Sequence, residues 1–198
     1  MTTEINAETS FEFMPRIAPA IWQLRPDFAA LSIVAKGCIN TSAMDWTSQR
    51  LAAAGRVGAQ QPDWAVAHLA AWQDAFRAFG AKPQRTPCSA EALRKRIERG
   101  GALPPVNAVV DVYNAVSIEF ALPVGGEDVD HYVSAPELTL AHGDEHFETM
   151  KDGQPAVENP DRGEVIWRDR QGVTCRRWNW RQGPRTRIDI GTRSMWFV

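Results

Sequence analysis

The sequence predicts an α+β protein in which helices come first along the chain and β hairpins follow. Two segments up to Pro123, residues 62–80 and 104–123, repeat apolar side chains at the spacing of a helix. After Pro123 the chain changes to short apolar runs separated by turn sequences such as "KDGQ" and "DRQG", which are typical of hairpins. Its 198 residues, 44% of them hydrophobic and 23% charged, suit one globular domain.

Composition and charge argue against several classes of protein. No apolar run approaches the roughly 20 residues that span a bilayer, and residues 1–13 lack the apolar core of a secretory signal. Three cysteines without a CxxC pair favour a reducing compartment, so we expect a cytoplasmic protein with no membrane partner. The net charge of −2 argues against a globally basic DNA-binding protein, but arginines crowd residues 162–193, where a local patch can guide a polyanion.

The N-terminal region divides into a leading segment and the start of the domain. We expect residues 1–27 to be an N-terminal segment that is loosely structured up to about residue 25, and residues 28–198 to form the single domain. The apolar, β-branched centre of "FAALSIVAKG" predicts a buried strand over Phe28–Gly37. The domain would therefore begin with a strand.

Two helices are predicted next. The first covers Pro62–Gly80, and His68 on its apolar face is expected to be a packed core residue rather than a ligand. The second covers Ser89–Gly101, with Ser89 as the N-cap. The second helix carries a basic face, which is either solvated or contacts phosphates: Arg94, Lys95, Arg96 and Arg99.

The strongest helical pattern follows the two prolines at 104 and 105. Asn107, Asp111 and Asn114 fall at positions i, i+4 and i+7, which places them on one face, and Ser117 lies near the end of that face. Polar groups on a largely apolar helix need partners when they are buried. They either cap neighbouring backbone or line a polar pocket.

The second half is predicted to be rich in strands. "GGEDVD" is expected to be a turn, and the strand candidates are "ELTLA", "HFETM", "EVIWRDR", "VTCRRWNW", "RTRIDI" and "SMWFV". Strand alternation through Val173–Gln182 would place Arg177, Asn179 and Arg181 on one face, opposite Arg176, Trp178 and Trp180.

The sequence contains no GxSxG, P-loop or GxGxxG motif. His142 and His146 are four residues apart, but they lie in a predicted turn without an obvious third ligand, so we expect no metal site. Cys175 has neighbouring arginines that can lower a thiol pKa, yet no histidine lies nearby in sequence to act as its base. We therefore expect no cofactor, and an enzymatic reaction that needs little more than binding and water positioning.

Three segments together resemble a known family. They are "GGALPPVNAVVDVYNAVSIEFALPVGGEDVD" (Gly100–Asp130), "GEVIWRD" (Gly163–Asp169) and "VTCRRWNWRQGPRTRIDIGTRSMWFV" (Val173–Val198). They resemble the B3/B4 editing domain of the phenylalanyl-tRNA synthetase β subunit, and more closely the freestanding proteins built from that domain alone. The resemblance implies helices packed on a mixed, barrel-like β core.

The resemblance also implies an activity and its partners. The chain looks like a trans-acting proofreading hydrolase that removes a wrong amino acid from the 3′ end of tRNA, with canavanyl-tRNA for arginine as one known substrate of freestanding relatives. The implied partners are the aminoacylated 3′ end and the amino-acid moiety. A non-catalytic module of the same fold that binds RNA or an amino acid stays open, as does an unrelated small-molecule hydrolase or regulator.

The resemblance and the polar stripe together supply the candidate residues. Candidates for catalysis are Asn114, Arg177 and Glu119. Candidates for substrate binding are Asn107, Asp111, Asn114, Ser117, Gly125, Cys175, Arg177, Asn179, Arg181, Gln182, Asp189 and Thr192. Candidates for tRNA binding are Arg94, Lys95, Arg96, Arg176, Trp178 and Arg185.

The sequence departs from the synthetase pattern at two places. A histidine that follows the proline matching Pro123 is replaced by Val124-Gly125-Gly126, and a glutamate of a later strand by Gly191-Thr192. Specificity for tyrosine is therefore not expected. A basic, guanidino-like amino acid would need a carboxylate partner, and the candidates are Asp111, Glu119, Asp128, Asp130 and Asp189.

Overall fold

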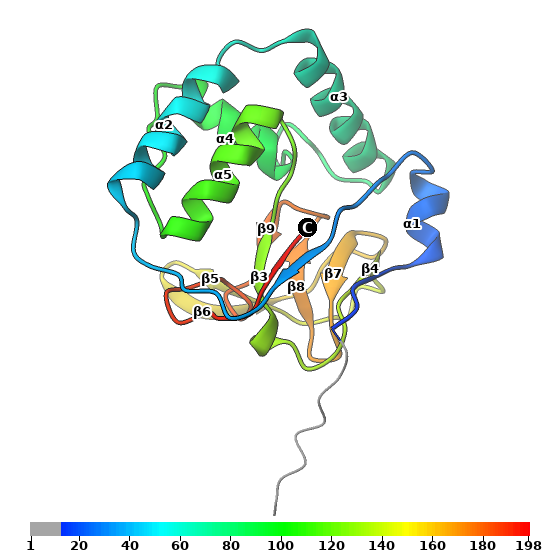
Figure 1. The fold of residues 1–198 in the computed structure, drawn as a ribbon. Coiled ribbons are helices and arrows are strands. Elements are labelled where there is room, and N and C mark those ends of the chain that lie inside the picture. The colour runs from blue at the N-terminus through cyan, green and yellow to red at the C-terminus, as the bar shows by residue number, and fades with distance from the viewer. Residues whose placement is uncertain (1–12) are drawn as a thin grey trace, which may run out of the picture.

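The computed structural model describes residues 13–198, with most helices in one layer and the strands in another (Figure 1). The helices are α1 (Pro19–Leu24), α2 (Asp45–Gly58), α3 (Asp63–Ala78), α4 (Ser89–Glu98) and α5 (Ala108–Phe120), with a short 3-10 helix at Val129–His131. The strands are β1 (Arg16–Ile17), β2 (Ile33–Ala35), β3 (Gly126–Asp128), β4 (Glu137–Leu140), β5 (Phe147–Lys151), β6 (Gln154–Glu158), β7 (Val165–Arg168), β8 (Val173–Arg176), β9 (Arg181–Gln182) and β10 (Met195–Phe197).

The strands form three sheets. The largest has the order β1-β4-β7-β8-β9, in which β1 runs parallel to β4 and the other pairs are antiparallel. A second sheet has the order β2-β10-β3, and β5 and β6 form a hairpin of their own. The α+β class and the mixed sheet agree with the sequence prediction. Within residues 13–198 none of these sheets closes on itself, so the barrel-like core is not confirmed.

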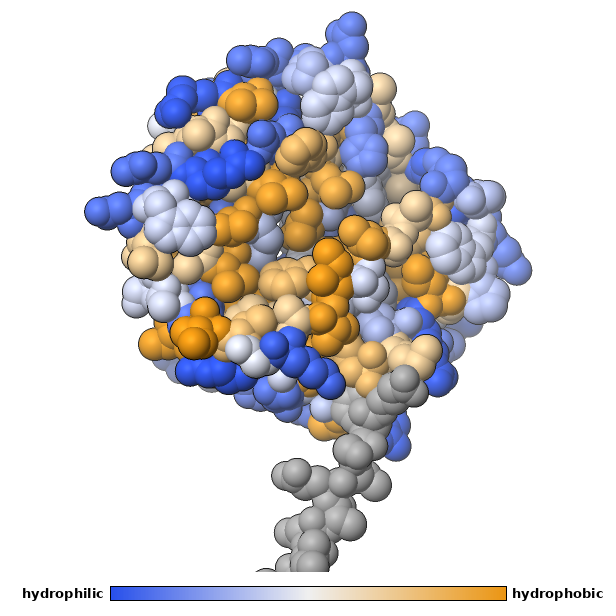
Figure 2. All heavy atoms as spheres, in the orientation of Figure 1, coloured by the Kyte–Doolittle hydropathy of each residue, from blue (hydrophilic) through white to orange (hydrophobic). Residues whose placement is uncertain are grey.

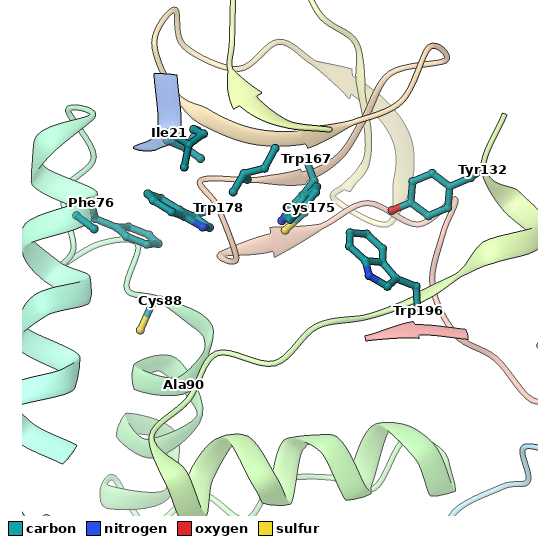
Figure 3. Packing of buried hydrophobic residues seen from close by; sticks show 12 residues of the cluster. Ile21, Phe76, Cys88, Ala90, Tyr132, Trp167, Cys175, Trp178 and Trp196 are labelled. Carbon is teal, nitrogen blue, oxygen red and sulfur yellow. The ribbon is translucent and has the colours of Figure 1, made fainter. Parts of the chain in front are cut away.

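The main core lies between the largest sheet and helices α1, α3 and α4. Figure 3 shows Trp178 beside Phe76 of α3, with Cys175 of β8 farther along the same layer. A second cluster joins α2 and α5 through Ala54 and Ile118. The helices approach closely there, because a Cβ on Gly58 would lie 2.7 Å from a methyl carbon of Ile118.

The helical predictions hold for α3 and α5, whereas α2 was not predicted. α3 begins one residue after Pro62 and ends two residues before Gly80. His68 is exposed and accepts a hydrogen bond from the Trp72 indole at 3.2 Å, so its expected place in the core is wrong. The buried residues of α3 are Ala65, Ala75 and Phe76. His68 faces solvent instead.

Ser89 begins α4 but is not its N-cap. Cys88 occupies the cap position and makes no side-chain capping hydrogen bond. The Ser89 backbone N–H instead donates to Asn179 Oδ1 at 3.1 Å. A side chain from the loop after β8 therefore satisfies the helix N-terminus, which local sequence could not reveal.

The N-terminal region also differs from expectation. Residues 13–25 are not loosely structured, because β1 pairs with β4 and Ile21 of α1 is fully buried; residues 1–12 lie outside the described part. The strand expected over Phe28–Gly37 shrinks to β2, whose residues are exposed or half-buried because it is the edge strand of its sheet. The division at residue 27 stays a prediction.

Most predicted strands of the second half are present, with two corrections. "GGEDVD" is not a turn, because Gly126–Asp128 forms strand β3, which pairs with the central strand β10, and the 3-10 helix follows. "RTRIDI" forms no strand and contributes only an isolated bridge between Arg187 and Glu127. No helix within residues 13–198 is long and apolar enough to cross a membrane.

Candidate functional site

The stretch after β8 turns sharply instead of continuing as a strand. Arg177 and Trp178 both have positive φ, 47° and 66°, and the Trp178 N–H donates to the Val165 carbonyl at 2.7 Å. The predicted alternation of faces across residues 176–181 is therefore wrong. Trp178 is only 3% exposed and packs edge-on against Phe28 and Trp72, so it cannot stack on an RNA base.

Two arginines expected to contact tRNA are committed to carboxylates. Arg176 is buried and donates to both oxygens of Glu164, at 2.9 and 2.7 Å, and to Glu158 at 2.9 Å. The hydrogen bonds that Arg176 donates to Glu164 raise the Arg176 pKa, which keeps this guanidinium charged. Arg185 likewise forms a fork on Asp169, at 2.7 and 3.0 Å.

Asp169 shows what this pairing does to a carboxyl group. Burial by itself raises the Asp169 pKa, but the hydrogen bond from Arg185 and those from backbone N–H groups outweigh burial and leave the pKa lowered. These ion pairs tie the loops of the β layer together. Arg176 and Arg185 are therefore structural, and their assignment to tRNA binding is wrong.

The polar stripe of α5 mostly caps neighbouring backbone. Asn107 is the N-cap: its Oδ1 accepts from the Val110 N–H at 3.0 Å, while its Nδ2 donates to the Ile188 carbonyl. Asp111 is fully buried and accepts from the Val106 N–H at 2.9 Å and from the Thr47 hydroxyl at 3.4 Å. The structure thus favours the capping alternative over the pocket wall for these two residues.

The other candidates on the helices differ in whether their side chains are free to bind a ligand. Glu119 forms an ion pair with Arg50, and Arg94 is buried and donates to the Ile118 carbonyl at 2.7 Å, so Arg94 is not free to bind tRNA. Ser117 is buried with a hydroxyl that has no partner among the described residues, while half-buried Asn114 remains uncommitted. On α4, Lys95 pairs with Glu91 at 2.6 Å and Arg96 is exposed.

The candidates near the C-terminus hold the chain end in place. The Thr192 hydroxyl donates to Asp128 at 2.6 Å, and Asp189 Oδ1 accepts from the backbone N–H groups of Gly191 and Thr192. The Gly125 N–H donates to the Val198 carbonyl at 2.7 Å. The carboxylates of Asp128 and Asp189 are therefore already hydrogen-bonded within the protein.

The sequence interpretation missed Glu127, the central residue of β3. Glu127 is buried, makes no ion pair, and has one carboxyl oxygen without a partner among the described residues. The Thr186 hydroxyl is likewise buried and unpaired. Gln182 lies in the same cluster, since its amide donates to the Gly126 and Thr186 carbonyls. Gln182 is therefore a predicted binding residue that the fold brings to this carboxyl.

Electrostatics make Glu127 unusual. Burial raises its pKa from 4.5 to about 7, although Thr186, Gln182 and Tyr132 favour the ionised form and Arg185 attracts it. The pKa values of Tyr113 and Tyr132 are raised too, mainly by burial and secondarily by the nearby charge of Glu127. Both phenol groups therefore stay neutral. A carboxyl group whose pKa lies near neutrality can both accept and release a proton under ordinary conditions.

A small depression adjoins this cluster. It has a volume of about 20 Å³, and Thr174, Gly183, Arg185 and Thr186 are among its lining residues. A volume of about 10–15 Å³ or more can hold one water molecule. Polar groups of the lining can supply the hydrogen bonds that such a water needs.

The two alternative chemistries considered from the sequence gain no support. Burial raises the Cys175 pKa, which disfavours the reactive thiolate. The neighbouring Arg176 and Arg177 form ion pairs with Glu164, so they do not activate the thiol. In residues 13–198 no three His, Cys, Asp or Glu side chains gather in a way that could hold a metal ion.

Comparison with models of known protein families shows to which family the chain belongs. A family model described as the B3/4 domain matches residues 71–198. The chain belongs to the B3/4 domain family. No curated protein matches the sequence. The B3/4 domain family is associated with editing or binding in proteins that resemble tRNA synthetases, which agrees with the resemblance and with a tRNA partner at that coarser level.

The matched B3/4 domain runs from within α3 to the last residue, so it contains Glu127, Gln182 and Thr186. Helices α1 and α2 lie before the match and complete its packing. Where the synthetase pattern has a histidine, this B3/4 domain has backbone contacts of Gly125. Glu127 lies between Gly126 and Asp128 in the buried strand β3, but the glycines and acidic residues of this segment are typical of a turn, so the sequence did not reveal it.

Proposed function

We propose that this B3/4 domain protein is a cytoplasmic, trans-acting hydrolase that deacylates mischarged aminoacyl-tRNA. The observation that carries the proposal is the uncommitted, buried carboxyl of Glu127 inside a domain of this family. Among the described residues Glu91 also has a buried oxygen without a partner, but its other oxygen is held by Lys95 and Gln73. Glu127 has no such ion pair.

The chemistry asked of the protein is hydrolysis of an activated ester. Water attacks the carbonyl carbon, and its proton passes to the Glu127 carboxylate. The bond from the carbonyl carbon to the ribose oxygen then breaks, and the proton is delivered to that oxygen. The products are a free amino acid and a tRNA with a free hydroxyl. Gln182 and Thr186 orient the carboxyl, and Asn114 is available to hold the substrate.

The test is loss of the ester from a panel of tRNAs charged with correct and near-cognate amino acids, including canavanine on arginine tRNA. Canavanine belongs in the panel because freestanding proteins that the sequence resembles act on it. The wild-type protein is expected to deacylate at least one mischarged member. Glu127→Gln is expected to lower that rate by about 10²-fold or more, since positioned acid–base groups contribute about 10²–10⁴.

The matched control is Glu98→Gln, which alters an exposed glutamate at the end of α4. The control should keep the wild-type rate. With Glu127 as proton acceptor, the wild-type rate rises as the pH passes through about 7, and Glu127→Gln removes that rise. Equal rates for wild type and Glu127→Gln would contradict the role of Glu127, and no turnover on any tRNA would contradict the activity.

A non-catalytic binding module of the same fold is the second candidate function. One observation favours it: Val124-Gly125-Gly126 stands where the synthetase pattern has a histidine, and Gly125 of this segment is hydrogen-bonded to Val198 through its backbone. A module of this kind would bind charged tRNA tightly and leave the ester intact. The same assay distinguishes the two functions when binding is measured alongside ester loss.

A further inference from the structure

A cleft of about 600 Å³ has Glu164 among its lining residues. One wall is the connection between α3 and α4, and the other is the turn between β6 and β7 together with the turn after β8. The size is within the roughly 300–1,000 Å³ typical of sites that hold small organic ligands.

Four cations line this cleft: Lys82, Arg85, Arg162 and Arg177. The two acidic residues of the lining are Asp161 and Glu164, and the charge of Glu164 is already balanced by buried Arg176. Positive charge therefore prevails in the cleft.

Three of these cations are free. Lys82, Arg85 and Arg162 are exposed and make no ion pair or side-chain hydrogen bond with any described residue. The backbone holds two of them in place, because the N–H groups of Arg85 and Thr86 both donate to the Lys82 carbonyl at 2.9 Å. This turn presents cations without neutralising them, as an anion site requires.

Arg177 adds an aromatic neighbour to the site. Its guanidinium lies 4.6 Å from the centre of the Trp180 ring and 3.5 Å from Glu164, so the side chain is fixed at the end of the cleft. Trp180 is half-buried and, unlike Trp178, keeps part of its ring accessible. Cations along a groove beside an aromatic ring are the usual arrangement for a single-stranded nucleic acid.

We propose that this cleft binds the phosphodiester backbone of single-stranded RNA next to the aminoacylated 3′ nucleotide. The assignment rests on the proposed function for the identity of the RNA, while the anion site itself rests on the charges of the cleft. Lys82, Arg85 and Arg162 contact phosphates, and Arg177 with Trp180 closes the end of the strand's path.

The test measures binding of uncharged tRNA to the full chain by fluorescence anisotropy over a range of salt concentrations. The double variant Arg85→Glu/Arg162→Glu is expected to weaken binding at least tenfold. The salt dependence should fall by about 1.4 in log–log slope, since each single-strand phosphate contact contributes about 0.7. The matched control is Arg16→Glu/Arg56→Glu, two exposed arginines outside the cleft that make no ion pair with any described residue.

Equal losses in the two double variants would overturn the proposal, as would no loss in either. A blunt-ended RNA hairpin that binds as tightly as tRNA would overturn the assignment of a single strand to the cleft. Full competition by millimolar inorganic phosphate would overturn RNA specificity and show that the cleft binds anions in general. Milder Arg85→Gln/Arg162→Gln should give an intermediate loss. All substituted residues are exposed, and melting temperatures should stay near wild type.

A phosphate-free substrate separates this proposal from the proposed function. If the protein is a deacylase, Arg85→Glu/Arg162→Glu should hydrolyse an aminoacyl ester of adenosine at the wild-type rate while its KM for aminoacyl-tRNA rises. Glu127→Gln should show the reverse, with normal tRNA binding and slow hydrolysis of both substrates. If no ester is hydrolysed by the wild type, the activity fails, yet the anisotropy experiment still decides the cleft.

Discussion

Replacing Glu127 by glutamine is expected to stabilise the protein in alkaline solution and to change its stability much less near pH 5. The buried carboxyl has its pKa raised from 4.5 to about 7. Below pH 4.5 the group is protonated in both the folded and unfolded states. As the pH rises from 4.5 to about 7, the unfolded chain loses this proton first, so the folded state loses stability across that window.

The size of the effect follows from the two pKa values. One pKa unit corresponds to about 1.4 kcal/mol, so the rise from 4.5 to about 7 costs about 3 kcal/mol once both states are ionised. Glutamine cannot ionise and avoids this cost. For a protein of this length, 1 kcal/mol shifts the melting temperature by about 2–4 °C, so the variant should melt several degrees above the wild type at pH 8.5.

The assay is urea denaturation of both proteins at pH 5 and pH 8.5, with Glu98→Gln as a control for an exposed glutamate. The difference between Glu127→Gln and wild type should grow by about 2–3 kcal/mol from the lower to the higher pH. The control should show no such growth. A difference that is the same at both pH values, or that shrinks on going to pH 8.5, would refute the reasoning that burial raises the Glu127 pKa.

Three further substitutions test the structural assignments. Trp178→Ala should destabilise the protein by about 3–5 kcal/mol in urea denaturation, because it empties a core site; a stable variant with weak tRNA binding would instead support base stacking. Arg176→Ala should cost about 3 kcal/mol because it removes the bidentate partner of buried Glu164 and leaves only the more distant Arg177 beside that carboxylate, whereas a solvated arginine would cost almost nothing. Asn107→Ala should cost about 1 kcal/mol through loss of the α5 cap, and no change in the denaturation midpoint would contradict that capping role.

The predictions that depend on neighbours along the chain were the successful ones. The periodicity of residues 108–120 predicts α5, because side chains three and four residues apart share a face regardless of the rest of the molecule. The capping alternative for Asn107 was open in the sequence for the same reason. The turn chemistry of "KDGQ" likewise predicts the β5–β6 hairpin, since Asp152 and Gly153 adopt the positive φ that the turn needs.

The stretch after β8 shows why local reasoning failed elsewhere. Its alternating residues read as a strand, but Trp178 gains more from burial against Phe28 and Trp72 than the strand would gain from continuing. Arg176 is drawn inward by Glu164, which lies twelve residues earlier in the sequence. Neither partner can be identified from the local pattern.

The sequence by itself determined the α+β class, helices α3 and α5 and most of the hairpin strands, because each depends on periodicity or turn chemistry within a few residues. It also carried the resemblance to the family. Only the tertiary structure decided which polar residues are free to act. Most arginines and carboxylates of the candidate list are paired with residues far away in the chain, whereas Glu127 and three cations of the cleft (Lys82, Arg85 and Arg162) make no ion pair with any described residue. Pairing across the fold depends on distance in space, which spacing along the chain does not encode.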